Sequence, residues 1–184
     1  MLRSHDSYAK EHYAFFVTCT VVEWVPLFTV GAYRDVILDS LRFLATEKPT
    51  ELNAYVLMPT HLHAILRPHP GARIGDLMRD FKRFTSRAIS RQAEERADER
   101  SLSVFCRARA AGRAQERSQY QVWQEGSFPE AIGSPRFARQ KLEYLHNNPV
   151  KAELAESAVA WPFSSARAYL LGEECDPPVQ VLPL

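Results

Sequence analysis

The sequence predicts an α+β fold in which one central antiparallel sheet has helices packed on it. Short β-branched and aromatic runs alternate with longer segments whose apolar residues recur at helical spacing, and two of the runs are separated by only a Pro-Thr pair. The length of 184 residues and the 46% hydrophobic content suffice for one core. We therefore expect a single domain over residues 1–170 and a C-terminal tail over residues 171–184.

The first part of the chain is predicted to contain three strands and one helix. Residues 12–22 read HYAFFVTCTVV, which is typical of a strand. Residues 33–48 have the apolar spacing of an amphipathic helix, which Pro49 ends. The apolar runs 52–58 and 62–66 should then pair as antiparallel strands across a tight turn.

The second part is predicted to contain a basic amphipathic helix, a last strand and a last helix. The helix covers residues 74–92, the strand residues 121–132, and the last helix runs from Pro135 to residue 146. Between them, residues 93–119 have little apolar content, so we expect a mobile insertion there. The resulting order, βαββαβα, fits a sandwich of the ferredoxin-like kind.

Composition excludes several classes of protein. The first residues are polar and no apolar run approaches a membrane-spanning length, so we expect a cytoplasmic protein without a membrane partner. The three cysteines form no CxxC pair, which argues against a disulfide framework and a thiolate zinc site.

Positive charge is concentrated on the basic helix and the segment after it. Residues 73–117 contain twelve Lys or Arg against seven Asp or Glu, although the whole chain carries a net charge of only +1. Phosphate contact is one interpretation and an ordinary solvated helix face is the other. The candidates for DNA contact are Arg79, Lys82, Arg83 and Arg87.

Two histidines occupy alternate positions of a predicted strand. Because side chains on a strand alternate between faces, His61 and His63 should point to the same side. Two imidazoles can bind a divalent transition metal or, with an added oxygen ligand, Mg²⁺ or Mn²⁺. The alternative is a pair of surface or partly buried histidines without a ligand.

A tyrosine and an asparagine share one face of the last predicted helix. Tyr144 and Asn148 are four residues apart, so the Asn148 side chain could supply an oxygen ligand beside the Tyr144 hydroxyl. A tyrosine nucleophile conserves the energy of a DNA phosphodiester in a phosphotyrosine, so that cutting and rejoining need no ATP. The alternative is a helix residue whose ring packs on the core.

Four sequence blocks follow one another along the chain: NAYVLMPTHLH at residues 53–63, FKRFT at 81–85, VWQ at 122–124 and YLHNNPVK at 144–151. Together they resemble the single-tyrosine HUH transposases, most closely their REP-associated tyrosine transposase branch, which has an IS200-like transposase domain. A fifth segment, WPFSSAR at residues 161–167, is similar to the short block that follows the catalytic helix in this family.

The resemblance implies a ferredoxin-like endonuclease and strand transferase that acts on single-stranded DNA beside hairpin-forming repeats through a 5′-phosphotyrosine. By position, His61, His63 and Asn148 look like the ligands of a Mg²⁺ or Mn²⁺ ion and Tyr144 like the nucleophile. Lys82 and the neighbouring Arg83 look like phosphate contacts. The resemblance is compatible with a monomer or a homodimer.

Three other functions stay open at this point. A non-catalytic module could bind single-stranded nucleic acid on an RRM-like sheet through exposed aromatics. A metal phosphoesterase could use water and leave Tyr144 dispensable. A silent relic of the family would have lost metal binding. The insertion at residues 93–119 is also longer than compact members of the family would need.

Overall fold

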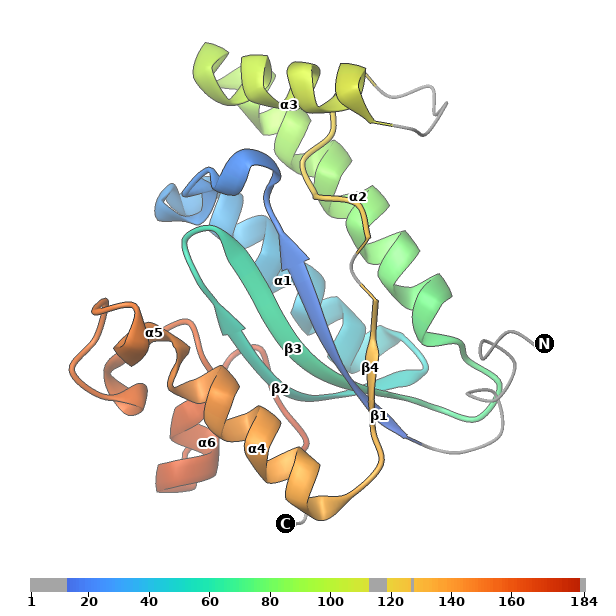
Figure 1. Ribbon diagram of the computed structural model, residues 1–184, viewed down its shortest axis with the longest axis vertical. Coiled ribbons are helices and arrows are strands. Elements are labelled where there is room, and N and C mark those ends of the chain that lie inside the picture. The colour runs from blue at the N-terminus through green and yellow to red at the C-terminus, as the bar shows by residue number, and fades with distance from the viewer. Residues whose placement is uncertain (1–12, 113–118, 127, 183–184) are drawn as a thin grey trace.

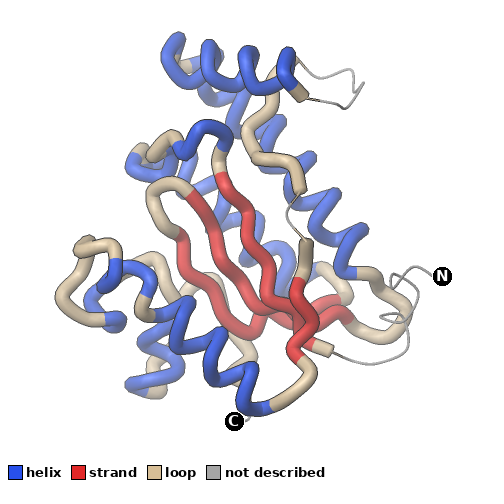
Figure 2. The backbone as a smooth tube through the Cα atoms, in the orientation of Figure 1, coloured by secondary structure: helices blue, strands red, loops and turns tan. Residues whose placement is uncertain are grey.

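A four-stranded antiparallel sheet runs through the middle of the protein, as Figures 1 and 2 show. The computed structural model describes residues 13–112, 119–126 and 128–182. The strand order is β2-β3-β1-β4, which is the order of a ferredoxin-like sandwich, so the predicted fold class is confirmed. The strands are β1 (Ala14–Thr20), β2 (Thr50–Leu57), β3 (His61–Pro68) and β4 (Glu130–Ile132).

Helices cover both faces of the sheet. Helices α1 and α2 lie on one face and α4 on the other, while α3 crosses the far end of α2 (Figure 1). The helices are α1 (Gly31–Glu47), α2 (Ile74–Glu95), α3 (Glu99–Ala111), α4 (Pro135–His146), α5 (Asn148–Lys151) and α6 (Ala166–Leu171). Three 3₁₀ turns are η2 (Val22–Trp24), η3 (Leu27–Thr29) and η4 (Ala158–Ala160).

The alternation of side chains along the strands divides the core into two apolar clusters. On β1, Phe15 and Val17 face α1 and α2, whereas Phe16 faces α4. The cluster under α1 and α2 is the larger one and includes the fully buried Ile37 and Ile89. The two-residue period of a strand therefore produces a sheet that is buried on both sides.

The predicted central hairpin and the two long helices, α1 and α2, are confirmed. Strands β2 and β3 pair antiparallel, with Leu57 opposite Leu62 and the turn at residues 58–60 between them. Helix α4 begins at Pro135, as predicted, and the hydroxyl of Ser134 accepts a hydrogen bond from the Phe137 amide at 3.2 Å. Pro149 does not end helical structure, because it lies in the first turn of α5, where a missing amide hydrogen costs nothing.

The predicted last strand, residues 121–132, is wrong in its extent. Only Glu130–Ile132 form β4, and Trp123 makes an isolated bridge with Val21. The chain between them departs from the ladder because Gly126 has a φ of +82° and Pro129 lacks an amide donor. Val122 and Trp123 are nevertheless buried in the larger cluster.

The segment predicted to be a mobile insertion, residues 93–119, contains helical structure. Residues 93–95 end α2, and residues 99–111 form α3. The Asp98 carboxylate accepts a hydrogen bond from the Ser101 amide at 3.1 Å and so caps the helix. Val104 and Phe105 are buried against the larger cluster. Residues 113–118 of the predicted insertion lie outside the described residues.

The segment expected to be a tail packs on the outer side of β2. The Gln180 amide donates to the Leu52 carbonyl at 2.9 Å, and the Tyr55 hydroxyl donates to the Asp176 carbonyl at 3.0 Å. Leu182 is buried in the cluster under α4. Farther along the strand, the Leu57 amide donates to the Phe163 carbonyl at 2.8 Å. The C-terminal residues up to 182 are therefore part of the packed structure.

In the part of the chain that the structure describes, no helix combines the length and the apolar character that crossing a membrane requires.

Candidate functional site

A cavity of about 360 Å³ lies between the sheet and α4. It occupies the face on which the alternating pattern of the strands presents polar side chains in place of apolar ones. Its walls come from β1, η2, β3, β4, α4 and α5. The lining residues are Phe16, Thr18, Trp24, His61, His63, Glu130, Lys141, Tyr144 and Asn148.

Both predicted histidines line this cavity, and each is oriented by a threonine. Thr18 lies opposite His63 in the pairing of β1 with β3, and its Oγ1 is 2.9 Å from the His63 Nδ1. The Oγ1 of Thr60 is 2.8 Å from the His61 Nδ1. The two imidazole centroids are 4.7 Å apart. With both Nδ1 atoms engaged, Nε2 is the nitrogen that each ring can offer to a ligand.

The environment favours the neutral form of both rings. Burial, with smaller contributions from the nearby His61 and Lys141, lowers the pKa of His63 to about 3. Burial also lowers the pKa of His61, although a hydrogen bond with the Asn148 side chain acts in the opposite direction. A metal ligand must be a neutral imidazole, so both residues are in the form that coordination requires near pH 7.

Tyr144 lies beside the histidines, on the face of α4 that is turned toward the sheet. Its ring meets the His63 ring edge to face with centroids 5.3 Å apart, and it meets Phe16 in the same manner at 5.9 Å. The residue is 42% exposed, so it is open to a ligand from solvent. The Lys151 Nζ lies 5.7 Å from the centroid of the same ring.

Asn148 completes the predicted set of polar groups at the start of α5. Asn148 lines the same cavity as the two imidazoles, and its side chain is a hydrogen-bond partner of His61. Among the described residues, His, Cys, Asp and Glu form no group of three that could hold a metal ion. Two neutral imidazoles and one amide fit a divalent cation whose remaining ligands are water and a phosphate from a substrate.

Five residues of the cavity were not predicted as site residues: Phe16, Thr18, Trp24, Glu130 and Lys141. Lys141 precedes Tyr144 by three residues on α4, so the helical period could have placed it on the same face. Its Nζ forms an ion pair with Glu130 at 2.7 Å and lies 4.5 Å from the Phe16 centroid. Trp24 gave no such signal, because its position depends on the unusual backbone of η2.

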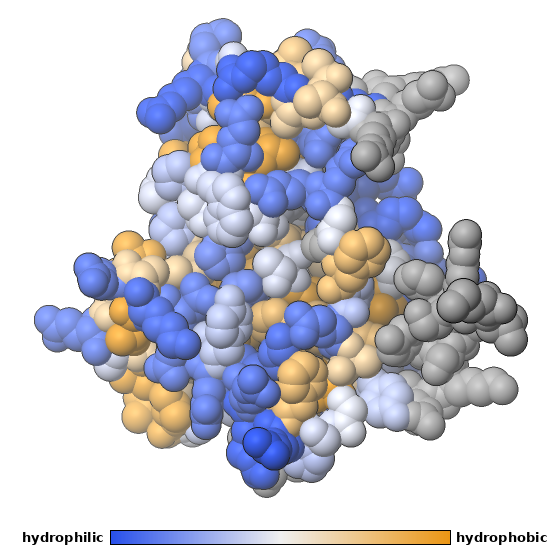
Figure 3. Space-filling view, viewed as in Figure 1, coloured by the Kyte–Doolittle hydropathy of each residue, from blue (hydrophilic) through white to orange (hydrophobic). Residues whose placement is uncertain are grey.

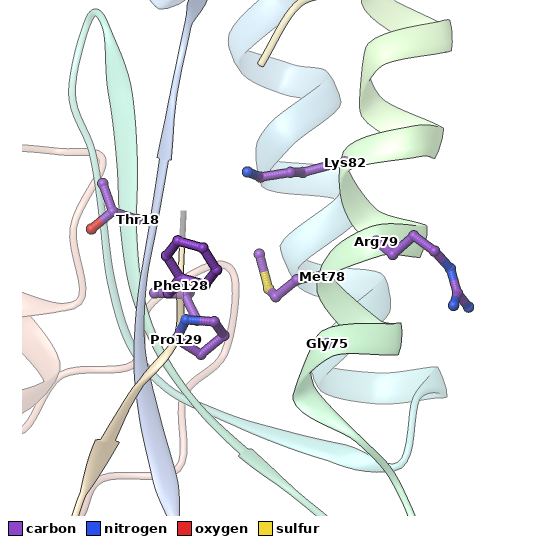
Figure 4. A pocket seen from close by; sticks show the side chains of 8 residues that line it. Thr18, Gly75, Met78, Arg79, Lys82, Phe128 and Pro129 are labelled. Carbon is purple, nitrogen blue, oxygen red and sulfur yellow. The ribbon is translucent and has the colours of Figure 1, made fainter. Parts of the chain in front are cut away.

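The four basic residues predicted to contact DNA do not line this cavity. They lie on α2, which covers the opposite face of the sheet. Lys82 and Arg79 line a second cavity of about 210 Å³ between β1 and α2, which shares Thr18 with the first one. Figure 4 shows Lys82 reaching toward β1 and Arg79 pointing away.

Three of these basic residues are exposed on the outside of α2. Arg79 pairs with Asp76 at 2.7 Å and with Asp80, and Arg83 pairs with Asp80 at 3.4 Å. Arg87 is exposed as well. On the face of the molecule that Figure 3 shows, most residues over α3 are hydrophilic, and hydrophilic and apolar residues are mixed near α4. A DNA contact through the residues of α2 stays a prediction.

His146, two residues after Tyr144, faces away from the cavity. Its Nε2 is 3.0 Å from the Ser165 hydroxyl, and its ring packs on Tyr169. Burial lowers its pKa to about 4. His146 is therefore a core residue that connects α4 to the C-terminal layer.

The β3 half of this site lies within a region that matches a known family. The family model described as "Transposase IS200 like" matches residues 26–106, from just after η2 to the middle of α3, which is less than half of the chain. This region is similar to the IS200-like transposases. The matched region contains His61, His63 and all four basic residues of α2, whereas Tyr144 and Asn148 follow it.

A solved structure shares the fold over most of the chain. It is a REP-associated tyrosine transposase bound to a REP hairpin, which is 20% identical and aligns with 95% of this chain and 90% of its own, at a TM-score of 0.57. A proposed transposase from Deinococcus radiodurans R1 is 18% identical and aligns with 80% of this chain and 95% of its own, but its TM-score of 0.43 carries no argument. A search of curated proteins finds no match.

Proposed function

We propose that this chain is an IS200-like transposase, a metal-dependent DNA transesterase that cleaves and rejoins single-stranded DNA through Tyr144. One observation carries the proposal. The Tyr144 ring lies 5.3 Å from the His63 ring in a cavity that also contains His61 and Asn148. Two segments about eighty residues apart in the sequence thus bring a nucleophile to a set of metal-binding groups.

The cavity provides each group that strand transfer needs. His61, His63 and Asn148 would hold a divalent cation, Mg²⁺ or Mn²⁺, which when bound polarises the scissile phosphate. Thr18 and Thr60 fix the two imidazole rings, so that the ligands are ordered before DNA arrives.

The proposed step exchanges one phosphodiester for another. The Tyr144 phenolic oxygen forms a bond to phosphorus while the bond from phosphorus to the 3′ oxygen breaks. The phenol loses its proton and the departing 3′ oxygen gains one, so the products are a 5′-phosphotyrosine and a free 3′ hydroxyl. The Lys141 ammonium stands on the same helix face, where it is paired with the Glu130 carboxylate of the cavity wall.

DNA with a hairpin is the substrate that we propose. The support is the relative with the same fold that was solved with a REP hairpin. We further propose that basic residues of α2 contact DNA phosphates outside the first cavity, and Lys82, which lines the second cavity, is the leading candidate.

The test uses end-labelled DNA hairpins with unpaired flanks, incubated with Mg²⁺, Mn²⁺ or EDTA and separated on a denaturing gel. The proteins are the wild type, Tyr144→Phe and, as a matched control, Tyr120→Phe, which removes a phenol that does not line the cavity. We expect a metal-dependent covalent band from the wild type and Tyr120→Phe, and none from Tyr144→Phe.

Two results would contradict the proposal. Equal cleavage by the wild type and Tyr144→Phe would identify a hydrolase that uses water as its nucleophile. Tight binding of all hairpins without cleavage by any protein would identify a non-catalytic binding module.

A further inference from the structure

Trp24 is an exposed aromatic residue at the rim of the cavity. Its side chain lines the same cavity as His61 and Tyr144, yet the residue is 59% exposed. The other two tryptophans have partners for their indole nitrogens: Trp123 donates to the Thr85 hydroxyl at 2.9 Å and Trp161 to the Leu57 carbonyl at 3.0 Å. Trp24 instead meets the edge of the His61 ring, at a centroid distance of 5.8 Å.

The backbone that carries Trp24 is held in a costly conformation. Glu23 has a φ of +52° and Trp24 a φ of +54°, a left-handed region that side chains other than glycine rarely adopt. The Trp24 amide donates to the Val21 carbonyl at 3.1 Å and the Val22 amide to the Val122 carbonyl at 2.9 Å. Strain of this kind persists where the surrounding structure enforces it, and it is concentrated at binding sites.

Helix α3 supports this turn from outside. Arg107 on α3 donates to the Glu23 carboxylate at 3.1 Å, so the helix is joined to the residue that precedes Trp24. Val22 and the α3 residue Phe105 belong to the same apolar cluster. The segment that was predicted to be a mobile insertion is thus in contact with the rim of the cavity.

We propose that Trp24 is a stacking platform for an unpaired nucleobase next to the scissile phosphate. The inference rests on the proposed function, because that function places the phosphate at His61 and His63. A base next to that phosphate is flat and uncharged, and a large exposed indole offers it a matching face. Since a paired base is already stacked within its duplex, this platform selects DNA that is unpaired at the cleavage position.

The experiment measures binding by fluorescence anisotropy in the Tyr144→Phe background, so that no chemistry is required. The probe is a DNA hairpin with an unpaired flank, together with a series that carries one abasic nucleotide at successive positions of that flank. The variants are Trp24→Ala, Trp24→Leu and Trp24→Phe. The control is Phe43→Ala, which removes an aromatic that is 51% exposed on α1 and does not line the cavity.

We expect Trp24→Ala and Trp24→Leu to weaken the Kd by about 5- to 150-fold, and Trp24→Phe and Phe43→Ala to have much smaller effects. At one position of the flank, the abasic nucleotide should weaken binding by the Trp24 protein but not by Trp24→Ala. The slope of log Kd against log salt should stay constant, because the indole carries no charge.

An unchanged Kd in Trp24→Ala, or equal losses for every abasic probe, would overturn the stacking proposal. The covalent band of Tyr144-containing protein is scored separately. If no covalent band forms but one abasic position still weakens binding only when Trp24 is present, the transesterase is refuted and the stacking platform stands. If the band is normal but no abasic position depends on Trp24, only the stacking platform is refuted.

Discussion

The face of the sheet under α1 and α2 and the face under α4 receive alternate residues of the same strands. On the first face these residues form one continuous apolar cluster, whereas on the second face the apolar cluster gives way to Thr18, His61 and His63. The larger of the two cavities described above lies where polar side chains replace apolar ones. The comparison indicates that stability is concentrated on one face and the proposed chemistry on the other.

The largest expected effect is a loss of stability on the α1 face. Ile37 is fully buried in the larger cluster. Ile37→Ala should lower the free energy of unfolding by about 2–5 kcal/mol, because it removes buried methyl groups and leaves a cavity. Urea denaturation measures the change, and the covalent band per folded molecule should stay the same. A loss below about 0.5 kcal/mol would break the comparison.

A substitution on the α4 face should lower activity and leave stability nearly unchanged. His61→Ala removes one proposed metal ligand, so the covalent band and the affinity for Mn²⁺ should each fall by about 100-fold or more. Gel quantification and calorimetric titration measure these losses. The stability should change little, because His61 is only partly buried. The matched control is His69→Ala, at an exposed histidine beyond β3; similar losses there would show that His61 has no special role.

The buried His146 should make the free energy of unfolding depend on pH. The pKa of His146 is lowered from 6.5 to about 4, so the unfolded chain takes up a proton below pH 6.5 that the folded chain refuses until pH 4. Stability is therefore lost as the pH falls through this window, by about 2 kcal/mol from this residue between pH 7 and pH 5. His146→Gln should reduce the difference between urea midpoints at the two pH values. His63 contributes a change of the same sign, so part of the difference should persist; an undiminished difference would contradict the assignment.

The smallest effect is expected for Thr18, which would act on metal binding through His63. Thr18→Val removes the hydroxyl at the His63 Nδ1 and should weaken Mn²⁺ binding by about tenfold. Thr18→Ser, which keeps the hydroxyl, should restore most of the affinity. Calorimetric titration of both variants separates orientation of the ring from packing. If both variants lose affinity equally, the hydroxyl of residue 18 is not sufficient for the effect, and the proposed role in orienting His63 is contradicted.

Most of the fold could be predicted because it is determined by local patterns. The strand hairpin follows from two apolar runs around Pro59, and α2 follows from a long amphipathic period. Helix α3 has too few apolar residues for a periodic signal, and its order depends on the contacts of Phe105 with distant parts of the chain. The C-terminal segment is held by backbone hydrogen bonds, which leave no trace in the pattern of side chains.

The site could be predicted only in halves from residue spacing. The two-residue period placed His61 and His63 on one side, and the four-residue spacing placed Tyr144 with Asn148 on one helix face. That the two halves meet was implied by the resemblance to a known family, because spacing does not report contacts across eighty residues. Trp24 was missed because its exposure depends on two left-handed residues that nothing in the sequence indicates.

The chain's own C-terminal residues close the outer edge of β2. Phe163 and Gln180 use main-chain groups of this strand, as do the amide and hydroxyl of Ser165. An open outer strand is a template on which another extended chain can add itself, and this is how sheets join into aggregates. Here that template is already occupied from within the molecule. The C-terminal segment therefore blocks the pairing of β2 with a strand of a second molecule. This effect on aggregation is independent of any chemistry at the cavity.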